Sequence, residues 1–251
     1  MKKLILLSLL VSFNSLAGIQ IISDLDDTIK ITNSGNLWES IGYGSARRKV
    51  YAGMPEFLAA SRSYVNALNV ISSSPRILKY QVKNLLRKHE IQTENIVLNR
   101  NFNRPGHTEY KTNAIKAMLE ASTDNFILMG DDVGEDPEIY DAIIKLYPSR
   151  ILASYIHIVK NRPVPATAIK YFTTLDLAIL EHQAGRLAEE NVSDVINSIF
   201  NVRELESVFP EFSYCPTERS NNASFREASY SADASALNNK LTEYCLHEWD
   251  D

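Results

Sequence analysis

Short apolar runs alternate with longer amphipathic stretches over residues 19–159, and polar segments separate them. The short runs are rich in Ile, Leu and Val, as is typical of strands buried on both faces of a sheet. They cover residues 19–22, 68–71, 96–98, 126–129 and 151–159. The longer stretches predict helices over about 53–67, 76–89, 108–119 and 137–147. This alternation predicts a doubly wound, Rossmann-like parallel α/β sheet.

The N-terminal segment indicates export. Two lysines precede an apolar stretch from Leu4 to Val11, and Ser15 and Ala17 supply the small residues of a cleavage site. This order is typical of a secretory signal peptide over residues 1–17, and its apolar stretch is short for a membrane span. The alternative is an N-terminal strand or helix of the fold. We therefore expect an exported protein, periplasmic or secreted.

The remaining chain divides into a core at residues 18–160 and a C-terminal extension at 161–251, where the alternation is lost. Within the extension, residues 174–182 and 191–200 are expected to be helical. Residues 215–240 are rich in Ser, Asn and Ala and are expected to be irregular.

The chain has two cysteines, Cys215 and Cys245, both near the C-terminus. In an exported protein this even count predicts a disulfide, and two free thiols are the alternative. We expect the tail to pack against the edge of the sheet, held there by the bridge.

Composition narrows the class of partner. The 251 residues carry a net charge of −5, and no basic run extends beyond Arg47 to Lys49, which argues against nucleic acid as a ligand. No segment after residue 17 is long and apolar enough to span a membrane, and no obvious amphipathic helix binds one. Peripheral membrane contact stays open.

Carboxylates gather where the first strand ends. Asp24, Asp26 and Asp27 are followed by Thr28, at an edge where open α/β sheets bind their ligands. Such clustering is unfavourable unless a cation or a catalytic task compensates, and a solvated acidic turn is the alternative. Asp24 could attack phosphorus as a nucleophile, and Asp26 could transfer protons to and from the reacting oxygens.

Two later strand ends add groups suited to an anion. Ser72 follows the second strand, and Ser74 before Pro75 is typical of an N-cap. If Thr108 is the N-cap of the next helix, Lys111 lies in a first turn that disfavours cations, which points to an external anion such as phosphate. Simple capping by Ser74 and an ordinary surface lysine are the alternatives.

Acids return after the fourth strand, at Asp131 and Asp132 beside Gly130, with Asp136 further on. Oxygen ligands from two loops suit Mg²⁺ rather than zinc. Asp136 also precedes Pro137 and could simply cap that helix. Asp131 has no such explanation, and a metal-assisted phosphotransfer site is predicted.

This order of motifs resembles the haloacid dehalogenase superfamily of phosphohydrolases. Asp26 to Lys30, Gly53 to Glu56, Ser72 to Pro75 and Asp136 to Tyr140 look like the catalytic domain of the actin-patch-associated type of phosphatidate phosphatase. The resemblance covers residues 19–159 and implies a nearly capless core whose inserts at 30–52 and 99–107 shape the substrate entrance.

The resemblance also implies roles for single residues. Asp24 would be the nucleophile and Asp26 the general acid and base, with the phosphate held by Ser72 and Lys111. Asp24, the main-chain carbonyl of Asp26, and Asp131 would bind Mg²⁺. Supporting residues would be Thr28, Asp132 and Asp136.

Three positions depart from the pattern: Asp132, Arg76 and His157. Asp132 stands where relatives have Ser, and is expected to add negative charge near the metal. Arg76 replaces a common aromatic, and His157 replaces an Arg. At the entrance, these two would bear on a lipid substrate.

Together these features predict an exported Mg²⁺-dependent phosphomonoesterase that forms an aspartyl-phosphate, with phosphatidate or a related lipid phosphate as its substrate by family resemblance. A phosphatase for a small soluble phosphomonoester is one alternative. Another is a non-catalytic secreted protein that binds a phosphorylated ligand. Phosphoryl transfer to an alcohol instead of water is a further option.

Overall fold

The computed structural model describes residues 17–32, 49–99, 106–210, 215–216 and 228–249. The predicted signal peptide lies outside this part of the chain, except for Ala17. The two inserts predicted to shape the entrance also lie largely outside it, at residues 33–48 and 100–105.

Six parallel strands form one sheet in the order β3-β2-β1-β4-β5-β6. Their bounds are β1 Ile19–Ser23, β2 Ala67–Pro75, β3 Asn95–Asn99, β4 Asn125–Asp131, β5 Ile151–His157 and β6 Ile169–Tyr171. The chain builds outward from β1 in one direction and then from β4 in the other, so the order reverses between these two strands. The predicted doubly wound α/β fold is confirmed, and its switch point lies between β1 and β4.

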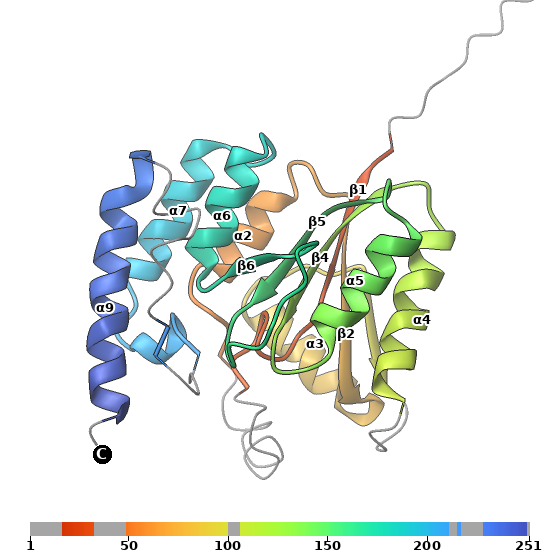
Figure 1. Cartoon of the computed structure of the whole chain (residues 1–251), viewed down its shortest axis with the longest axis horizontal. Coiled ribbons are helices and arrows are strands. Elements are labelled where there is room, and N and C mark those ends of the chain that lie inside the picture. The colour runs from red at the N-terminus through yellow and green to blue at the C-terminus, as the bar shows by residue number, and fades with distance from the viewer. Residues whose placement is uncertain (1–16, 33–48, 100–105, 211–214, 217–227, 250–251) are drawn as a thin grey trace, which may run out of the picture.

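Helices cover both faces of the sheet (Figure 1). They are α2 Met54–Ser61, α3 Lys79–Lys88, α4 His107–Glu120, α5 Asp136–Leu146, α6 Thr174–Gln183 and α7 Glu189–Phe200. Alternate strand residues face opposite cores: Ile21 packs in the core with α2, α3, α6 and α7, whereas Ile22 packs with α4 and α5. Both faces of β1 are therefore buried, as its continuous apolar run predicts.

Two differences from the predicted elements concern the strands. Strand β2 continues through Ser72 to Pro75, which we expected to form a loop and a helix start. Strand β6 was not predicted because its three residues are too few to show a period. It pairs with β5, so part of the predicted extension belongs to the sheet. The division at residues 160 and 161 itself stays a prediction.

The expectation of an irregular segment over 215–240 is wrong for its second half. Helix α9 spans Ser231–Trp249, after a short 3-10 turn at Ala228–Tyr230. Buried apolar residues follow the helical spacing of three and four from the end of the 3-10 turn through α9: Tyr230, Ala234, Leu237, Leu241 and Tyr244. Serines and asparagines on the exposed face conceal this stripe when composition alone is considered.

Cys215 and Cys245 form the predicted disulfide. The tail packs against helix α6 and the turn at Phe209 rather than the predicted sheet edge. Tyr230 meets His182 of α6 with ring centroids 6.0 Å apart, and Tyr244 meets Phe209 at 5.9 Å. Within the described ranges, no helix combines the length and apolar character needed to cross a membrane.

Candidate active site

Asp24 is positioned by the main chain of the neighbouring strand. Its N–H donates to the carbonyl of Met129 in β4 at 2.8 Å, immediately after the β1–β4 ladder ends. The hydroxyl of Tyr140 in α5 donates to the same carbonyl, also at 2.8 Å. Tyr140 lies one turn after Asp136, so this bond fixes the start of α5 beside Asp24.

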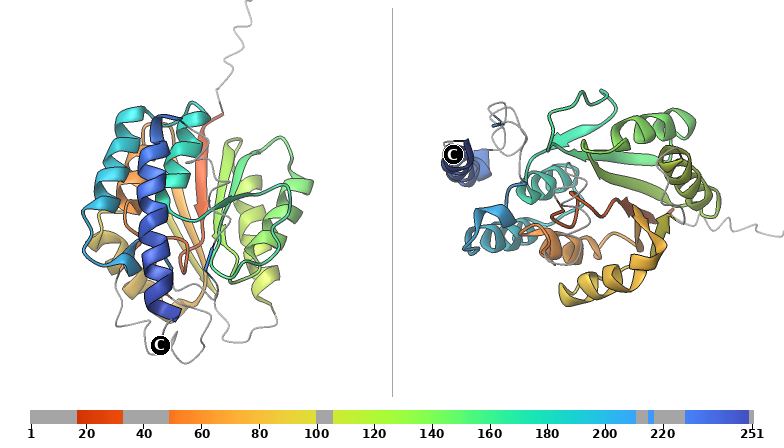
Figure 2. Two further views of the ribbon diagram at one scale, coloured as in Figure 1. Left: turned by 60° about the vertical axis from the view of Figure 1, so that its left-hand side comes forward. Right: turned by 90° about the horizontal axis from the view of Figure 1, so that it is seen from below.

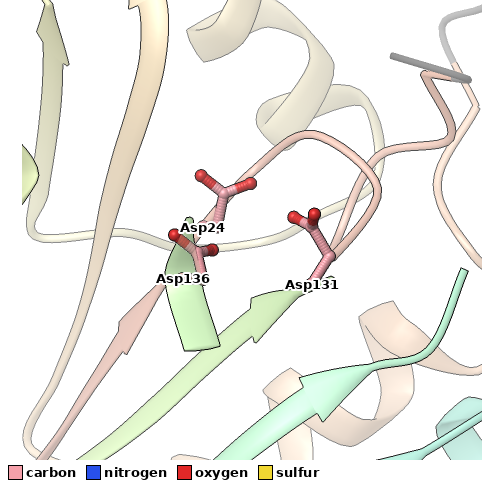
Figure 3. A group of neighbouring side chains, drawn as sticks. All are labelled: Asp24, Asp131 and Asp136. Carbon is pink, nitrogen blue, oxygen red and sulfur yellow. The ribbon is translucent and has the colours of Figure 1, made fainter. Parts of the chain in front are cut away.

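Three carboxylates meet at the carboxyl ends of β1 and β4. Asp24, Asp131 and Asp136 each offer an oxygen atom, and these atoms all lie within 4.8 Å of one another. Figure 3 shows their side chains pointing toward a common space. All three residues are buried. A Cβ at Gly130 would come within 2.4 Å of Asp136 Oδ2, so the approach of Asp136 requires glycine there.

Lys111 of α4 enters this cluster. Its Nζ donates to Asp24 Oδ1 at 2.7 Å and to Asp136 Oδ1, and its side chain is 7% exposed. One ammonium cannot balance three carboxylates, so negative charge is in excess. Asp136 Oδ2 is buried and has no hydrogen-bond partner among the described residues. The cluster is short of positive charge and has a free acceptor.

The charge excess shifts the protonation of the cluster. Burial, together with the nearby charges of Asp136 and Asp26, raises the pKa of Asp24 to about 8, although Lys111 opposes the shift. Burial and the charges of Asp136 and Asp24 also raise the pKa of Asp131 well above its ordinary range. Burial alone would lower the pKa of Lys111, but Asp136 and Asp24 raise it. Lys111 is therefore cationic at neutral pH.

These residues fit a hard divalent cation. The donors are carboxylate oxygens from two strand ends and one helix start, which is the ligand chemistry of Mg²⁺. A cation here would remove the charge excess and give Asp136 Oδ2 a partner. Asp24, Asp131 and Asp136 are the residues that would hold it. Asp136 is thus one of the three candidate ligands, whereas the sequence implied only a supporting role.

Mg²⁺ is expected to raise the Tm of the protein, and by more at about pH 8.5 than at about pH 6.5. The pKa of Asp24 in the folded protein is about 8, above the ordinary value near 4, so the stability of the metal-free protein falls as pH rises through about 8. At lower pH a proton occupies the cluster and competes with the metal. Binding at hundredfold excess over Kd should add about 2.7 kcal/mol, or several degrees in Tm. Calorimetry with and without Mg²⁺ at both pH values measures this.

Asp131→Asn is expected to remove most of the Mg²⁺-dependent gain in Tm, since it deletes one ligand. The matched control is Asp132→Asn, which changes the neighbouring acid. Equal gains at the two pH values, or an undiminished gain in Asp131→Asn, would contradict the assignment of the cation to this cluster.

Asp26 is held by four side chains. Lys30 Nζ and Thr32 Oγ1 donate to its Oδ1 at 3.1 and 2.9 Å. The hydroxyls of Ser72 and Ser74 donate to its Oδ2 at 3.1 and 2.9 Å. Burial would raise the pKa of Asp26, but Lys30 and the bonds from Ser74 and Thr32 lower it overall. Asp26 is therefore ionised in the ligand-free protein.

This arrangement corrects the expectation for the second strand. Ser74 does not cap a helix: it lies within β2, and α3 begins four residues after Pro75, behind the 3-10 turn Arg76–Leu78 (η1). Sequence reasoning missed Ser74, Lys30 and Thr32 as site residues. The signal for Ser74 is its spacing of two from Ser72, because alternate residues of a strand point to the same side.

Helix starts differ from the prediction at two further places. Gly106, not Thr108, is the N-cap of α4, so Lys111 lies in the second turn and not the first. Asp136 does not cap α5 either: the N-cap is Glu135, and no side chain bonds the helix end. The carboxylate of Asp136 points to Lys111 instead. The first correction removes the helix-dipole argument for Lys111, which its contacts with Asp24 and Asp136 now place in the site. The second leaves the Asp136 carboxylate free of a capping role.

Among the other predicted residues, Thr28 belongs to the site, whereas Asp132 and His157 do not. The hydroxyl of Thr28 donates to Asp131 Oδ2 at 3.3 Å. The other oxygen of Asp131 accepts the N–H groups of Val133 at 2.8 Å and Gly134 at 3.2 Å. Asp27 is buried with φ of 58°, and its Oδ1 accepts the N–H of Thr32 at 3.0 Å.

Asp132 is turned away from the cluster. Its Oδ1 accepts the N–H groups of Val159 at 2.7 Å and Lys160 at 2.8 Å, and its Oδ2 accepts that of Arg162 at 2.9 Å. These bonds use the carboxylate to hold the chain after β5. The expectation that Asp132 adds charge beside the metal therefore lacks a geometric basis.

His157 is also not an entrance residue. It is 2% exposed, and its ring stacks on Tyr171 with centroids 4.8 Å apart. Its Nδ1 lies 2.7 Å from the carbonyl oxygen of Asp27, which joins β5 to the turn after β1. Burial lowers the pKa of this imidazole. His157 supports the loop that carries Asp26 and Asp27.

Residues 19–158 match the family model described as phosphatidate phosphatase APP1, catalytic domain. No curated protein sequence matches this chain. Among solved structures, a chain from the structure of the Pnkp1/Rnl/Hen1 RNA repair complex is similar, with a TM-score of 0.43 and 12% identity. The match covers 63% of this chain and 44% of that one, so less than half of the other chain is represented.

Proposed function

This chain belongs to the family of the phosphatidate phosphatase APP1 catalytic domain, and from that premise we propose that it is an exported, Mg²⁺-dependent phosphomonoesterase acting on phosphatidate or a related lipid phosphate. The observation that carries the proposal is the buried cluster of three carboxylates with a single lysine. Export is supported by the pattern of residues 1–17, and a chain that stays uncleaved inside the producing cell would contradict it.

The first step transfers the phosphoryl group of the substrate to Asp24. A carboxylate oxygen of Asp24 attacks phosphorus, the bond from phosphorus to the ester oxygen breaks, and an aspartyl-phosphate forms. Lys111, which lies 2.7 Å from the attacking group, offsets the negative charge of the phosphoryl oxygens. Bound Mg²⁺ would supply further charge neutralisation at the same oxygens.

Asp26 handles the protons. The approach of a phosphate dianion raises the pKa of a nearby carboxylate, and Ser72 can turn from Asp26 to a phosphoryl oxygen. Both changes favour a protonated Asp26, which gives its proton to the leaving alkoxide. In the second step Asp26, again ionised, takes a proton from the water that attacks phosphorus, and inorganic phosphate and free Asp24 result.

The substrate class rests on the family, and the chemistry rests on the site. A small soluble phosphomonoester uses the same reacting groups, so it is the alternative substrate. A non-catalytic protein that binds a phosphorylated ligand would need none of the four hydrogen bonds that hold Asp26. Their presence favours an enzyme.

The test is release of inorganic phosphate by residues 18–251, with phosphatidate in mixed micelles and with a small aryl phosphate, each with Mg²⁺ and with a chelator. We expect Mg²⁺-dependent release from both and a higher kcat/KM for phosphatidate. Turnover of the aryl phosphate alone would indicate a soluble substrate. No turnover of either, with retained binding of a phosphorylated ligand, would contradict an enzymatic function. Label from an added alcohol in the phosphorylated product would indicate transfer to alcohols.

A further inference from the structure

The segment from Arg76 to Lys88, which comprises η1 and α3, is strongly basic. It contains five Lys and Arg residues and no acidic residue, in a chain whose net charge is −5. Among the described residues, no carboxylate pairs with Arg76, Lys79 or Lys83. This segment therefore carries a local charge opposite to that of the whole protein.

The same segment exposes large apolar side chains. Ile77 is 76% exposed and Tyr80 is 71% exposed, the two highest values among the exposed large hydrophobic residues. They do not pack into the core, because the inward side of α3 is formed by Val82, Leu85 and Leu86. We refer to the outward-facing group as the α3 face: Arg76, Ile77, Lys79, Tyr80 and Lys83.

The α3 face lies near the carboxyl ends of the strands, where the active site is. Arg76 directly follows Pro75, and Ser74 donates a hydrogen bond to Asp26. In Figure 1, α3 begins at the lower side, where the parallel strands β1 and β2 end. Viewed from below in Figure 2, α3 lies at the rim of the molecule, with no described element outside it.

A cleft of about 2150 Å³ links the α3 face to the active-site helix. Arg76, Lys79 and Lys83 line one part of it, and Gly106 and Tyr110 at the start of α4 line another. Tyr110 is adjacent in sequence to Lys111. The basic side chains lie at the α3 end of this cleft, and Glu56, Glu90 and Glu94 line other parts of it.

We propose that the α3 face docks the protein on an anionic lipid surface. Lys79 and Lys83 meet the negative headgroups, and Ile77 and Tyr80 enter the interfacial layer, where an aromatic ring with a polar end is favoured. This inference rests on the proposed function, because it brings the active-site edge to a lipid phosphate. It also names a surface for the peripheral membrane contact that the sequence left open.

The two exposed apolar residues favour lipid over other partners. A basic face that only contacts water would gain no stability from an exposed Ile beside an exposed Tyr. A nucleic acid would be attracted by the charges, but a phosphate backbone offers no apolar layer to Ile77. The anionic surface therefore accounts for both properties of the face, and nucleic acid remains as an outcome of the test.

The test is sedimentation with vesicles of phosphatidylcholine containing about a third phosphatidylglycerol and no phosphatidate, compared with phosphatidylcholine alone. Lys79→Gln with Lys83→Gln is expected to reduce partitioning to the anionic vesicles roughly 25-fold, at about fivefold for each basic residue. Ile77→Ser with Tyr80→Ser is expected to reduce it by about tenfold. The matched control is Ile169→Ser with Lys170→Gln, an exposed pair on β6 at the opposite sheet edge, which should leave partitioning unchanged.

Hydrolysis of the soluble aryl phosphate is measured on the same proteins. Loss of vesicle binding with retained aryl phosphate turnover and unchanged Tm supports the docking face. Turnover without vesicle binding by the wild type overturns it and leaves the phosphatase proposal standing. Vesicle binding without turnover of the aryl phosphate overturns the phosphatase proposal and leaves the docking face standing. An equal loss of vesicle binding in the β6 control variant also overturns the docking face. So does binding to an RNA oligonucleotide that is tighter than binding to vesicles and is unchanged by Ile77→Ser with Tyr80→Ser.

Discussion

Asp24→Asn is expected to lower kcat by on the order of 10⁴-fold or more, because the amide does not attack phosphorus and no phosphoryl-enzyme can form. The fold should tolerate the change. Asp24 is one of three buried carboxylates that repel one another, and Lys111 keeps Asp136 as a partner. The metal-free Tm of the variant is therefore expected to equal or exceed that of the wild type. Initial rates and calorimetry measure the two effects.

The covalent step can be observed directly. Acid quenching during turnover of a phosphate-labelled substrate is expected to trap label on Asp24 in the wild type, and none in Asp24→Asn. Asp132→Asn is the matched control because it makes the same replacement on a neighbouring loop. It should cost about 1–3 kcal/mol of stability through lost backbone hydrogen bonds, while kcat is kept. Equal loss of activity in the two variants would contradict the assignment of the nucleophile.

Arg186→Met is expected to destabilise the protein by about 3–5 kcal/mol, and to lower Tm by about 10 °C. Arg186 donates to both oxygens of Glu181 at 2.6 Å, and Glu181 is fully buried. The hydroxyls of Tyr64 and Tyr155 complete the group at 2.9 and 2.5 Å. Removing the guanidinium leaves a buried carboxylate without its cation. Denaturant unfolding measures the loss.

Two comparisons separate this effect from general damage. Lys145→Met breaks the exposed pair with Asp141 and should cost about 0.5 kcal/mol or less. In a Glu181→Gln background, Arg186→Met should cost much less than in the wild type, since no charge is then left behind. A loss below about 1 kcal/mol in the single variant would mean that water reaches Glu181. kcat below the melting range should stay unchanged, because the group lies outside the active site.

Features governed by local periodicity could be predicted from the sequence. The apolar runs at β1 and β4 identify central strands, and their carboxyl ends must meet in a parallel sheet. Asp24 and Asp131 follow from that placement alone. Lys111 was predicted from a first-turn position that it does not occupy, so its place in the site follows from its contacts with Asp24 and Asp136 and not from that argument.

Features decided by tertiary contacts could not be predicted. Asp132 differs from Asp131 only by the direction of its side chain, which depends on where the backbone after β5 returns. The hydrogen bonds from Lys30 and Thr32 to Asp26 depend on the turn that places Asp27 at positive φ. The stripe of α9 is long enough to be visible, but it is diluted by small polar residues between its apolar positions.

The carbonyl of Met129 accepts hydrogen bonds from both Asp24 and Tyr140. Because the acceptor is a main-chain atom, the side chain at position 129 takes no part, and other apolar residues could occupy that site without moving the nucleophile. The loop after β1 and the start of α5 are both hydrogen-bonded to this one peptide group of β4. A displacement of β4 therefore carries Asp24 and Asp136 together, and the distance between them is preserved while the sheet moves.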